Sequence, residues 1–342
     1  MEFDHHTLPA QRTTCRRLAT CALLLFCASI GSESYAAKCL FVASYHRGYE
    51  WNDGIERGVD NTLKGRCELY KFFMDTKRNK GVAFAERKAL EAKAYIEKIE
   101  PDVVIAADDN ASKYLVKPYF KDARLPFVFC GINWTAQPYG YPYSNATGII
   151  EVAPIRPLLK AIRQIVDQPG RGVYLSADVL TERKDYQRYR ESYAKKGIVL
   201  QGVFAKTMQA WREQYIAAQA QEIDFIVLNN NSGINDWDSR EAVRIAQRYN
   251  HVLTVTNYDW MMQYAMFAMT KLPEEQGEWA AQVALAILDG EPAASIPIIT
   301  NRRWNIFANP QLLEKANIQL PAHLMHKAIK VASTQEIKEA KL

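Results

Sequence analysis

The sequence predicts an α/β protein with two αβα lobes, each built around a parallel sheet, and a hinge between the lobes. Two sets of short apolar runs alternate with helical stretches, as expected for parallel strands joined by helices. The first set begins near Leu40, Leu69, Val103 and Phe127, and the second near Val173, Val199, Phe225 and Val252. Parallel strands present ligand groups at their carboxyl ends, so two such sheets in series can close on one small molecule.

The first set of strands is expected at residues 40–44, 67–73, 102–107 and 127–130. Between the first two strands, Ile55, Val59 and Leu63 recur at helical spacing. A charged helix over 83–99 is expected to stop before Pro101, because proline does not continue a helix. The extended segment 147–150 is expected to cross from this set to the second.

The second set starts with a helix at Pro154, since proline suits a first helical turn. A long helix is expected over 274–288, followed by a further extended crossing at 296–299. We therefore expect the first lobe to comprise 38–146 plus about 258–297, and the second 147–257 plus about 298–330. Residues 331–342 are expected to form a polar tail.

Residues 1–37 have the pattern of an export signal peptide. Arg12, Arg16 and Arg17 form a basic region, an apolar run covers 18–30, and small residues allow cleavage near Ala36 or Ala37. Export would place the mature chain in the periplasm or outside the cell. Roughly 305 residues would remain, enough for two domains.

The charge pattern does not indicate a nucleic-acid surface. The net charge is only +5, and acidic and basic residues are mixed along most of the chain. The basic cluster at 77–80 is expected to be a solvated loop.

Three cysteines remain once the predicted signal peptide is removed, Cys39, Cys67 and Cys130. Cys39 opens the first strand and Cys67 the second, and consecutive parallel strands are usually neighbours. A Cys39–Cys67 disulfide is therefore predicted, which an exported protein can keep. Cys130 is expected to be a buried free thiol.

Polar and aromatic residues gather after the predicted strands, where this fold places a ligand. Such side chains supply flat surfaces for stacking and fixed hydrogen-bond partners. The candidate ligand-binding residues are Ser44, Tyr45, His46, Trp51, Asp108, Asp109, Asn110, Asn133, Trp134, Ser176, Asp178, Asn230, Asn231, Asn257, Tyr258 and Asp259. Each Asp, Asn or Ser in this set could instead be an ordinary helix cap.

The sequence contains few catalytic motifs. We therefore expect that the protein is not an enzyme and that it has no cofactor and no metal site. His46 could pair with Asp108 or Asp109, but no serine or cysteine lies in a nucleophile-elbow motif. His323 and His326 have a spacing that metal sites use, but no third ligand is near them in the sequence.

Three segments carry a family resemblance. Residues 43–55, Ala-Ser-Tyr-His-Arg-Gly-Tyr-Glu-Trp-Asn-Asp-Gly-Ile, resemble the opening of substrate-binding proteins of ABC importers, in the family that includes tryptophan- and tyrosine-type binders. Residues 145–151 are similar to that family's Thr-Gly crossing, and 276–281 with 287–292 and 296–298 resemble its late helix and final crossing. The resemblance implies a type I periplasmic-binding-protein fold, with three crossings between lobes.

The resemblance also implies capture of a solute and its delivery to a membrane permease. We therefore expect a monomeric binding protein that captures a small organic ligand, an amino acid or similar amphipathic compound. One alternative is a ligand-sensing module that partners a signalling protein. Another is a periplasmic enzyme that uses His46 with Asp108 or Asp109.

Overall fold

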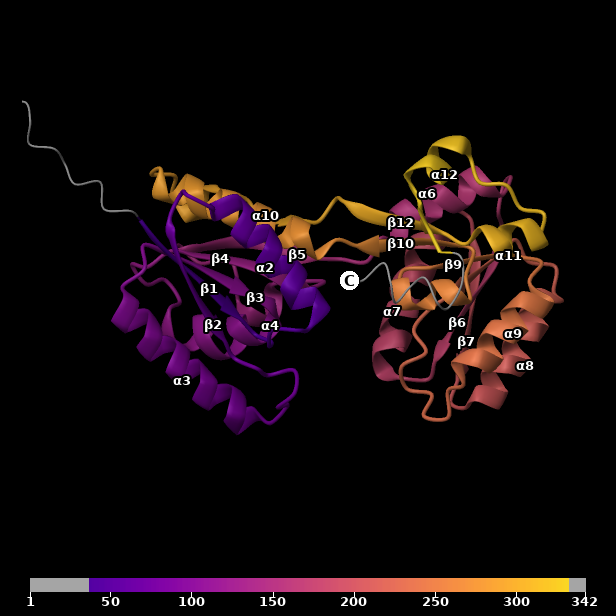
Figure 1. Ribbon diagram of the computed structural model, residues 1–342, viewed down its shortest axis with the longest axis horizontal. Coiled ribbons are helices and arrows are strands. Elements are labelled where there is room, and N and C mark those ends of the chain that lie inside the picture. The colour runs from indigo at the N-terminus through magenta and orange to yellow at the C-terminus, as the bar shows by residue number, and fades with distance from the viewer. Residues whose placement is uncertain (1–36, 332–342) are drawn as a thin grey trace, which may run out of the picture.

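The computed structural model describes residues 37–331, which form two α/β lobes joined by extended segments (Figure 1). The predicted signal peptide and polar tail lie almost wholly outside the described residues. The predicted fold class is confirmed, because each lobe has a mostly parallel sheet with helices on both faces.

The first sheet has six strands in the order β11-β5-β4-β3-β1-β2, all paired in parallel. Its strands are β1 (Lys38–Ala43), β2 (Glu68–Phe73), β3 (Val103–Ala107), β4 (Phe127–Asn133), β5 (Ala146–Glu151) and β11 (Ile299–Thr300). Its helices are α2 (Glu50–Leu63), α3 (Val82–Ile99), α4 (Asp108–Asn110), a π-helical turn (Ala111–Val116), α5 (Lys117–Tyr119), a 3₁₀ turn (Gln137–Tyr139) and α10 (Pro273–Leu288).

Helices cover both faces of this sheet, which explains why its strands are almost continuously apolar. In β1, Leu40 and Val42 pack toward α3, whereas Phe41 and Ala43 pack toward α2 and α10. Alternate side chains of one strand thus enter two different cores.

The second sheet has seven strands in the order β13-β12-β10-β9-β8-β6-β7. Its strands are β6 (Arg171–Ala177), β7 (Val199–Ala205), β8 (Phe225–Leu228), β9 (Leu253–Thr256), β10 (Phe267–Lys271), β12 (Trp304–Ala308) and β13 (Ile329–Lys330), and only β10–β12 is antiparallel. Its helices are α6 (Ile155–Ile165), α7 (Leu180–Ala194), α8 (Met208–Gln219), α9 (Ser239–Tyr249), α11 (Pro310–Lys315), α12 (Ala322–Lys327) and a 3₁₀ turn (Asp259–Gln263). One further 3₁₀ turn, Ala293–Ser295, precedes β11.

The chain changes sheet after β5, after β10 and after β11. The segment 147–150, expected as a crossing, is paired with β4 inside the first sheet, and the crossing follows it. The structure also assigns β10 to the second sheet, although residues 258–297 were expected in the first lobe. A paired strand and an extended linker have the same backbone conformation, so the sequence does not separate them.

Helices α2 and α10 lie side by side in the first lobe although they come from opposite ends of the chain (Figure 1). Glycines make this approach possible, because a Cβ on Gly277 would lie 2.0 Å from the Ile55 carbonyl oxygen. A Cβ on Gly58 would lie 2.4 Å from the Glu274 carbonyl oxygen. The two helices therefore meet backbone to backbone.

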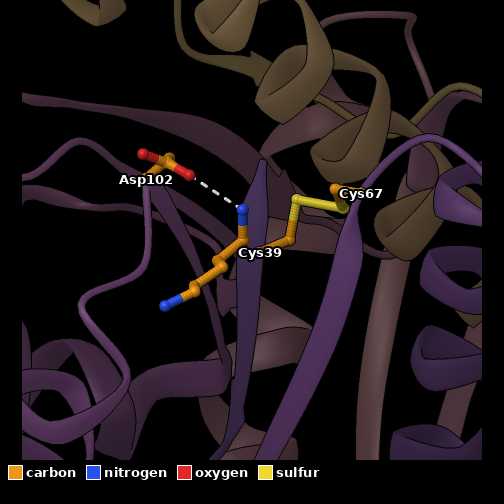
Figure 2. The surroundings of a disulfide bond; sticks show 4 residues. Cys39, Cys67 and Asp102 are labelled. Carbon is orange, nitrogen blue, oxygen red and sulfur yellow. Dashed lines mark hydrogen bonds between the residues drawn. A yellow bond between two sulfur atoms is a disulfide. The ribbon is translucent and has the colours of Figure 1, made fainter. Parts of the chain in front are cut away.

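The predicted Cys39–Cys67 disulfide is confirmed, with 6.0 Å between the two Cα atoms (Figure 2). It joins the start of β1 to the residue before β2, since these strands are parallel neighbours. Beside it, the Lys38 amide donates a 2.8 Å hydrogen bond to Asp102. Cys130 is a buried free thiol.

Among residues 37–331, no helix has both the length and the apolar character needed to cross a membrane.

Candidate functional site

A cavity of about 650 Å³ opens between the lobes, at the carboxyl ends of strands from both sheets. A second cavity of about 470 Å³ adjoins it. The two share Lys77, Asn133, Glu151, Asn257, Tyr258 and Lys271, so they form one continuous space, which we call the cleft.

Nine of the sixteen predicted ligand-binding residues line the cleft. They are Tyr45, Trp51, Asp108, Asn133, Trp134, Asn230, Asn257, Tyr258 and Asp259. The first five come from the first lobe and the last four from the second, so both lobes present aromatic and polar groups to the same space.

Three other predicted residues hold the first lobe's loops in place. The buried Ser44 hydroxyl donates to the Ala107 carbonyl and accepts from the Ala111 amide, which joins β1 to the helix after β3. Asn110 donates to Thr76. Asp109 accepts from Asn133 and from Tyr139, so it orients a cleft side chain instead of lining the cleft.

The remaining four predicted residues lie away from the cleft lining. Ser176 is buried and bonds to a backbone carbonyl, and Asp178 pairs with Arg183 at 2.6 Å. Asn231 accepts a backbone hydrogen bond in the turn after β8. His46 lies in a separate pocket, where its Nδ1 is 3.4 Å from Asp75.

The placement of His46 bears on the enzyme alternative. In the part of the chain that the structure describes, His46 pairs with Asp75, whereas Asp108 bonds to Trp51 and Asp109 to Asn133 and Tyr139. The proposed pairing of His46 with Asp108 or Asp109 is therefore not formed. No group of His, Cys, Asp and Glu within residues 37–331 is arranged to hold a metal ion.

Asp108 is the most strained acidic residue of the cleft. Its φ is +69°, a left-handed conformation that is uncommon for residues other than glycine. Its side chain is buried, and Oδ1 accepts a 2.9 Å hydrogen bond from the Trp51 indole, while Oδ2 has no partner. Burial, reinforced by the nearby Glu151 charge, raises the pKa of Asp108 well above its usual value.

Several cations rest on aromatic rings of the cleft. The Lys77 ammonium lies 4.6 Å from the Tyr49 ring centroid and 5.1 Å from that of Tyr45. Across the cleft, the Arg188 guanidinium of α7 lies 4.2 Å from the ring centroid of Trp134. The cleft thus combines aromatic faces with charges of both signs, which suits a small amphipathic molecule.

The sequence model of a family described as ABC transporter substrate binding protein matches residues 52–332. The chain belongs to this family. The family is extracytoplasmic, and it implies a small-molecule ligand and an ABC transporter as partner. No match was found among curated proteins.

Solved structures show the same fold as this substrate-binding protein. A ligand-free, open substrate-binding protein with adhesive properties from Clostridium difficile has 13% identity and a TM-score of 0.68, over 87% of this chain and 100% of that one. An ABC domain from Streptococcus pneumonia in complex with L-Trp has 13% identity and a TM-score of 0.53, with the same coverage. A conserved domain protein from Vibrio cholerae has 16% identity and a TM-score of 0.54, again with the same coverage.

The binding protein's cleft also contains charged residues that sequence reasoning missed. Glu151 ends β5 and Lys271 ends β10, and the two form an ion pair between the first and second sheets. Burial raises the pKa of Glu151, and Lys271 opposes that shift. Lys77 also lines the cleft, although its basic cluster was expected only as a solvated loop.

Glu182 is a further missed residue, at the start of α7. It is 1% exposed and accepts hydrogen bonds from the hydroxyls of Tyr174, at 2.7 Å, and Tyr258, at 3.2 Å. Burial raises the pKa of Glu182 to about 7. A strand-end signal could have found it, because α7 follows β6 directly.

The binding protein should lose stability through Glu182 as the pH rises from about 4.5 to 7. The folded pKa exceeds the unfolded value of 4.5, so the folded state binds more protons within this window. The destabilisation by ionised Glu182 is absent below about pH 4.5 and complete above about pH 7, where it reaches about 3 kcal/mol. We expect Glu182→Gln to match the wild type near pH 4.5 and to exceed its unfolding free energy increasingly toward pH 8.

Urea denaturation of the wild type and of Glu182→Gln across this pH range gives the unfolding free energy of each. Subtracting one from the other removes the contribution of groups that titrate in both proteins, such as Asp185. A constant difference between Glu182→Gln and wild type would contradict the assignment.

Proposed function

We propose that the cleft captures an amino acid or a similar small organic molecule. Such a ligand has an aromatic or aliphatic body and carries an amine or a carboxylate. The observation that carries this proposal is that both lobes line one cavity of about 650 Å³ with aromatic and charged side chains. Volumes of 300–1,000 Å³ are typical of small-molecule sites. The L-Trp complex of a protein with the same fold makes such a ligand a natural first test.

The three connections between the sheets support capture by hinge closure. A ligand that contacts residues of both lobes binds the closed form better than the open form, so it shifts the population toward closure. The closed complex would then be the form delivered to an ABC importer. The basic and apolar segments within residues 1–37 support export, with cleavage near Ala36 or Ala37.

The proposal is tested by a melting-temperature screen of the mature protein, after unfolding and refolding to remove any carried-over ligand. The panel contains amino acids, aromatic acids, nucleosides, polyamines and sugars. A ligand at about a hundred times its Kd adds about 2.7 kcal/mol to stability, which gives a clear shift. A single compound class that raises the melting temperature supports the proposal, and sugars as the only hits would contradict the ligand class.

Trp134→Ala and Tyr258→Ala are each expected to weaken ligand binding by about 10- to 100-fold, because aromatic anchors dominate binding energy. Isothermal titration of the screened ligand measures the change. Tyr119→Ala removes a ring outside the cleft lining and is the matched control, with no change expected. Wild-type affinity in both cleft variants would remove these two rings from the binding site.

A further inference from the structure

Two carboxyl groups of the cleft are buried without a cation. Asp108 and Glu182 are each 1% exposed. Their hydrogen-bond donors are neutral, the Trp51 indole for Asp108 and the Tyr174 and Tyr258 hydroxyls for Glu182. Within residues 37–331, no lysine, arginine or histidine forms an ion pair with either, and Lys77 acts on Asp108 only at longer range.

Three other acidic residues of the cleft have cationic partners. Lys271 pairs with Glu151, Arg188 with Asp185 at 2.7 Å, and Arg57 with Glu274. Within residues 37–331, these three carboxylates have an ion-pair partner, whereas Asp108 and Glu182 form no ion pair.

An ionised carboxylate that is buried without a cation is strongly destabilised, so the group stays protonated until a positive charge arrives. Asp108 has the further cost of an unpartnered oxygen, Oδ2. A cation bound in the cleft would stabilise the ionised form of either carboxyl. Uncompensated groups of this kind are concentrated at functional sites, where a ligand completes them.

The two carboxyls lie beyond the carboxyl ends of strands in different lobes. Asp108 follows β3 of the first sheet, and Glu182 lies in the first turn of α7, the helix after β6 of the second. Each lies behind an aromatic ring that lines the cleft and donates to it, Trp51 in the first lobe and Tyr258 in the second. The Lys271 ammonium already lies 5.3 Å from the Trp51 ring centroid, so this ring accepts a cation in front of Asp108. An organic cation beside these rings gains cation–π attraction as well as the attraction of the carboxylate behind the ring.

From this arrangement we infer that the ligand is a protonated organic amine whose charge is taken up by Asp108 of the first lobe and Glu182 of the second. The inference rests on the proposed function and narrows its ligand class to compounds that carry a protonated amine. A single ligand charge attracted from both sides would favour the closed form, because each lobe supplies one of the two carboxyls.

The test uses four indole compounds that differ in charge: tryptamine is a cation, L-tryptophan a zwitterion, N-acetyltryptamine neutral and indole-3-propionate an anion. Putrescine and spermidine are added as amines without a ring. Each is screened by melting temperature at about 10 mM, and its Kd is then measured by titration. Compounds with an amine are expected to bind at least about tenfold more tightly than their neutral and anionic counterparts.

Asp108→Asn and Glu182→Gln keep the side-chain shape and remove the charge. Each is expected to weaken amine binding by about 10- to 100-fold, while the ligand-free variant melts at or above the wild-type temperature. A purely structural role would instead lower the melting temperature. Asp178→Asn, which removes a carboxylate paired with Arg183 outside the cleft lining, is the matched control and should bind amines as the wild type does.

If indole-3-propionate binds as tightly as tryptamine, or if both amide variants bind amines with wild-type affinity, the inference is overturned and the proposed function stands. If every probe and the whole broader panel fail to bind, both are overturned.

Discussion

Lys271→Met is expected to destabilise the protein by about 3–5 kcal/mol, because it leaves a buried carboxylate without its cation. The partner, Glu151, has a side chain that is only 6% exposed, and Lys271 itself is 26% exposed. The pair joins the end of β5 to the end of β10, at two of the points where the chain changes sheet. Guanidinium denaturation measures the loss as a lower midpoint.

Two control variants sharpen this prediction. Glu151→Gln combined with Lys271→Met removes both charges and should recover most of the lost stability. Lys93→Met breaks an exposed pair with Glu97 within α3 and should change stability by less than about 0.5 kcal/mol. If Lys271→Met and Lys93→Met lowered the unfolding free energy equally, burial of Glu151 would not be the reason that the Lys271–Glu151 pair stabilises the protein.

Replacing Cys39 and Cys67 together by alanine is expected to lower the unfolding free energy by about 3–4 kcal/mol, since the disulfide closes a loop with a sequence separation of 28. The bond restricts the unfolded chain, and its loss restores that freedom. Urea denaturation with and without reductant measures the effect.

Reductant should lower the stability of the wild type and leave the double alanine variant unchanged, because Cys130 is a buried free thiol. A wild type that is insensitive to reductant under unfolding conditions would contradict a stabilising disulfide.

The sequence predicted the fold, the disulfide and the family because these depend on local patterns. Apolar runs such as those at Leu40 and Val103 are strands with both faces buried, and their spacing leaves little choice of fold. Cys39 and Cys67 could be paired because adjacent parallel strands bring their first residues together.

The site was predicted less completely, because ligand contact and helix capping use the same polar side chains. Ser44 and Asn110 follow strands as Tyr45 and Asp108 do, yet they bond to the protein's own loops. Nothing in the local sequence separates the two uses.

Lys271 was missed for a different reason. Its strand, β10, was not recognised, and its partner Glu151 lies 120 positions earlier in the chain. The two side chains come together only when both sheets have formed, so no local sequence pattern predicts the pair.

The contact between α2 and α10 also determines when each lobe can be completed. The Arg57–Glu274 pair on these helices spans 217 positions, and the face of β1, β3 and β4 beneath them stays exposed until α10 arrives. Folding that depends on such distant segments is slow, because a long loop must close before the contacts form. The first lobe is synthesised first but cannot complete its core until α10 has been made. The apolar face of its sheet therefore stays accessible to other molecules during most of the synthesis of the chain.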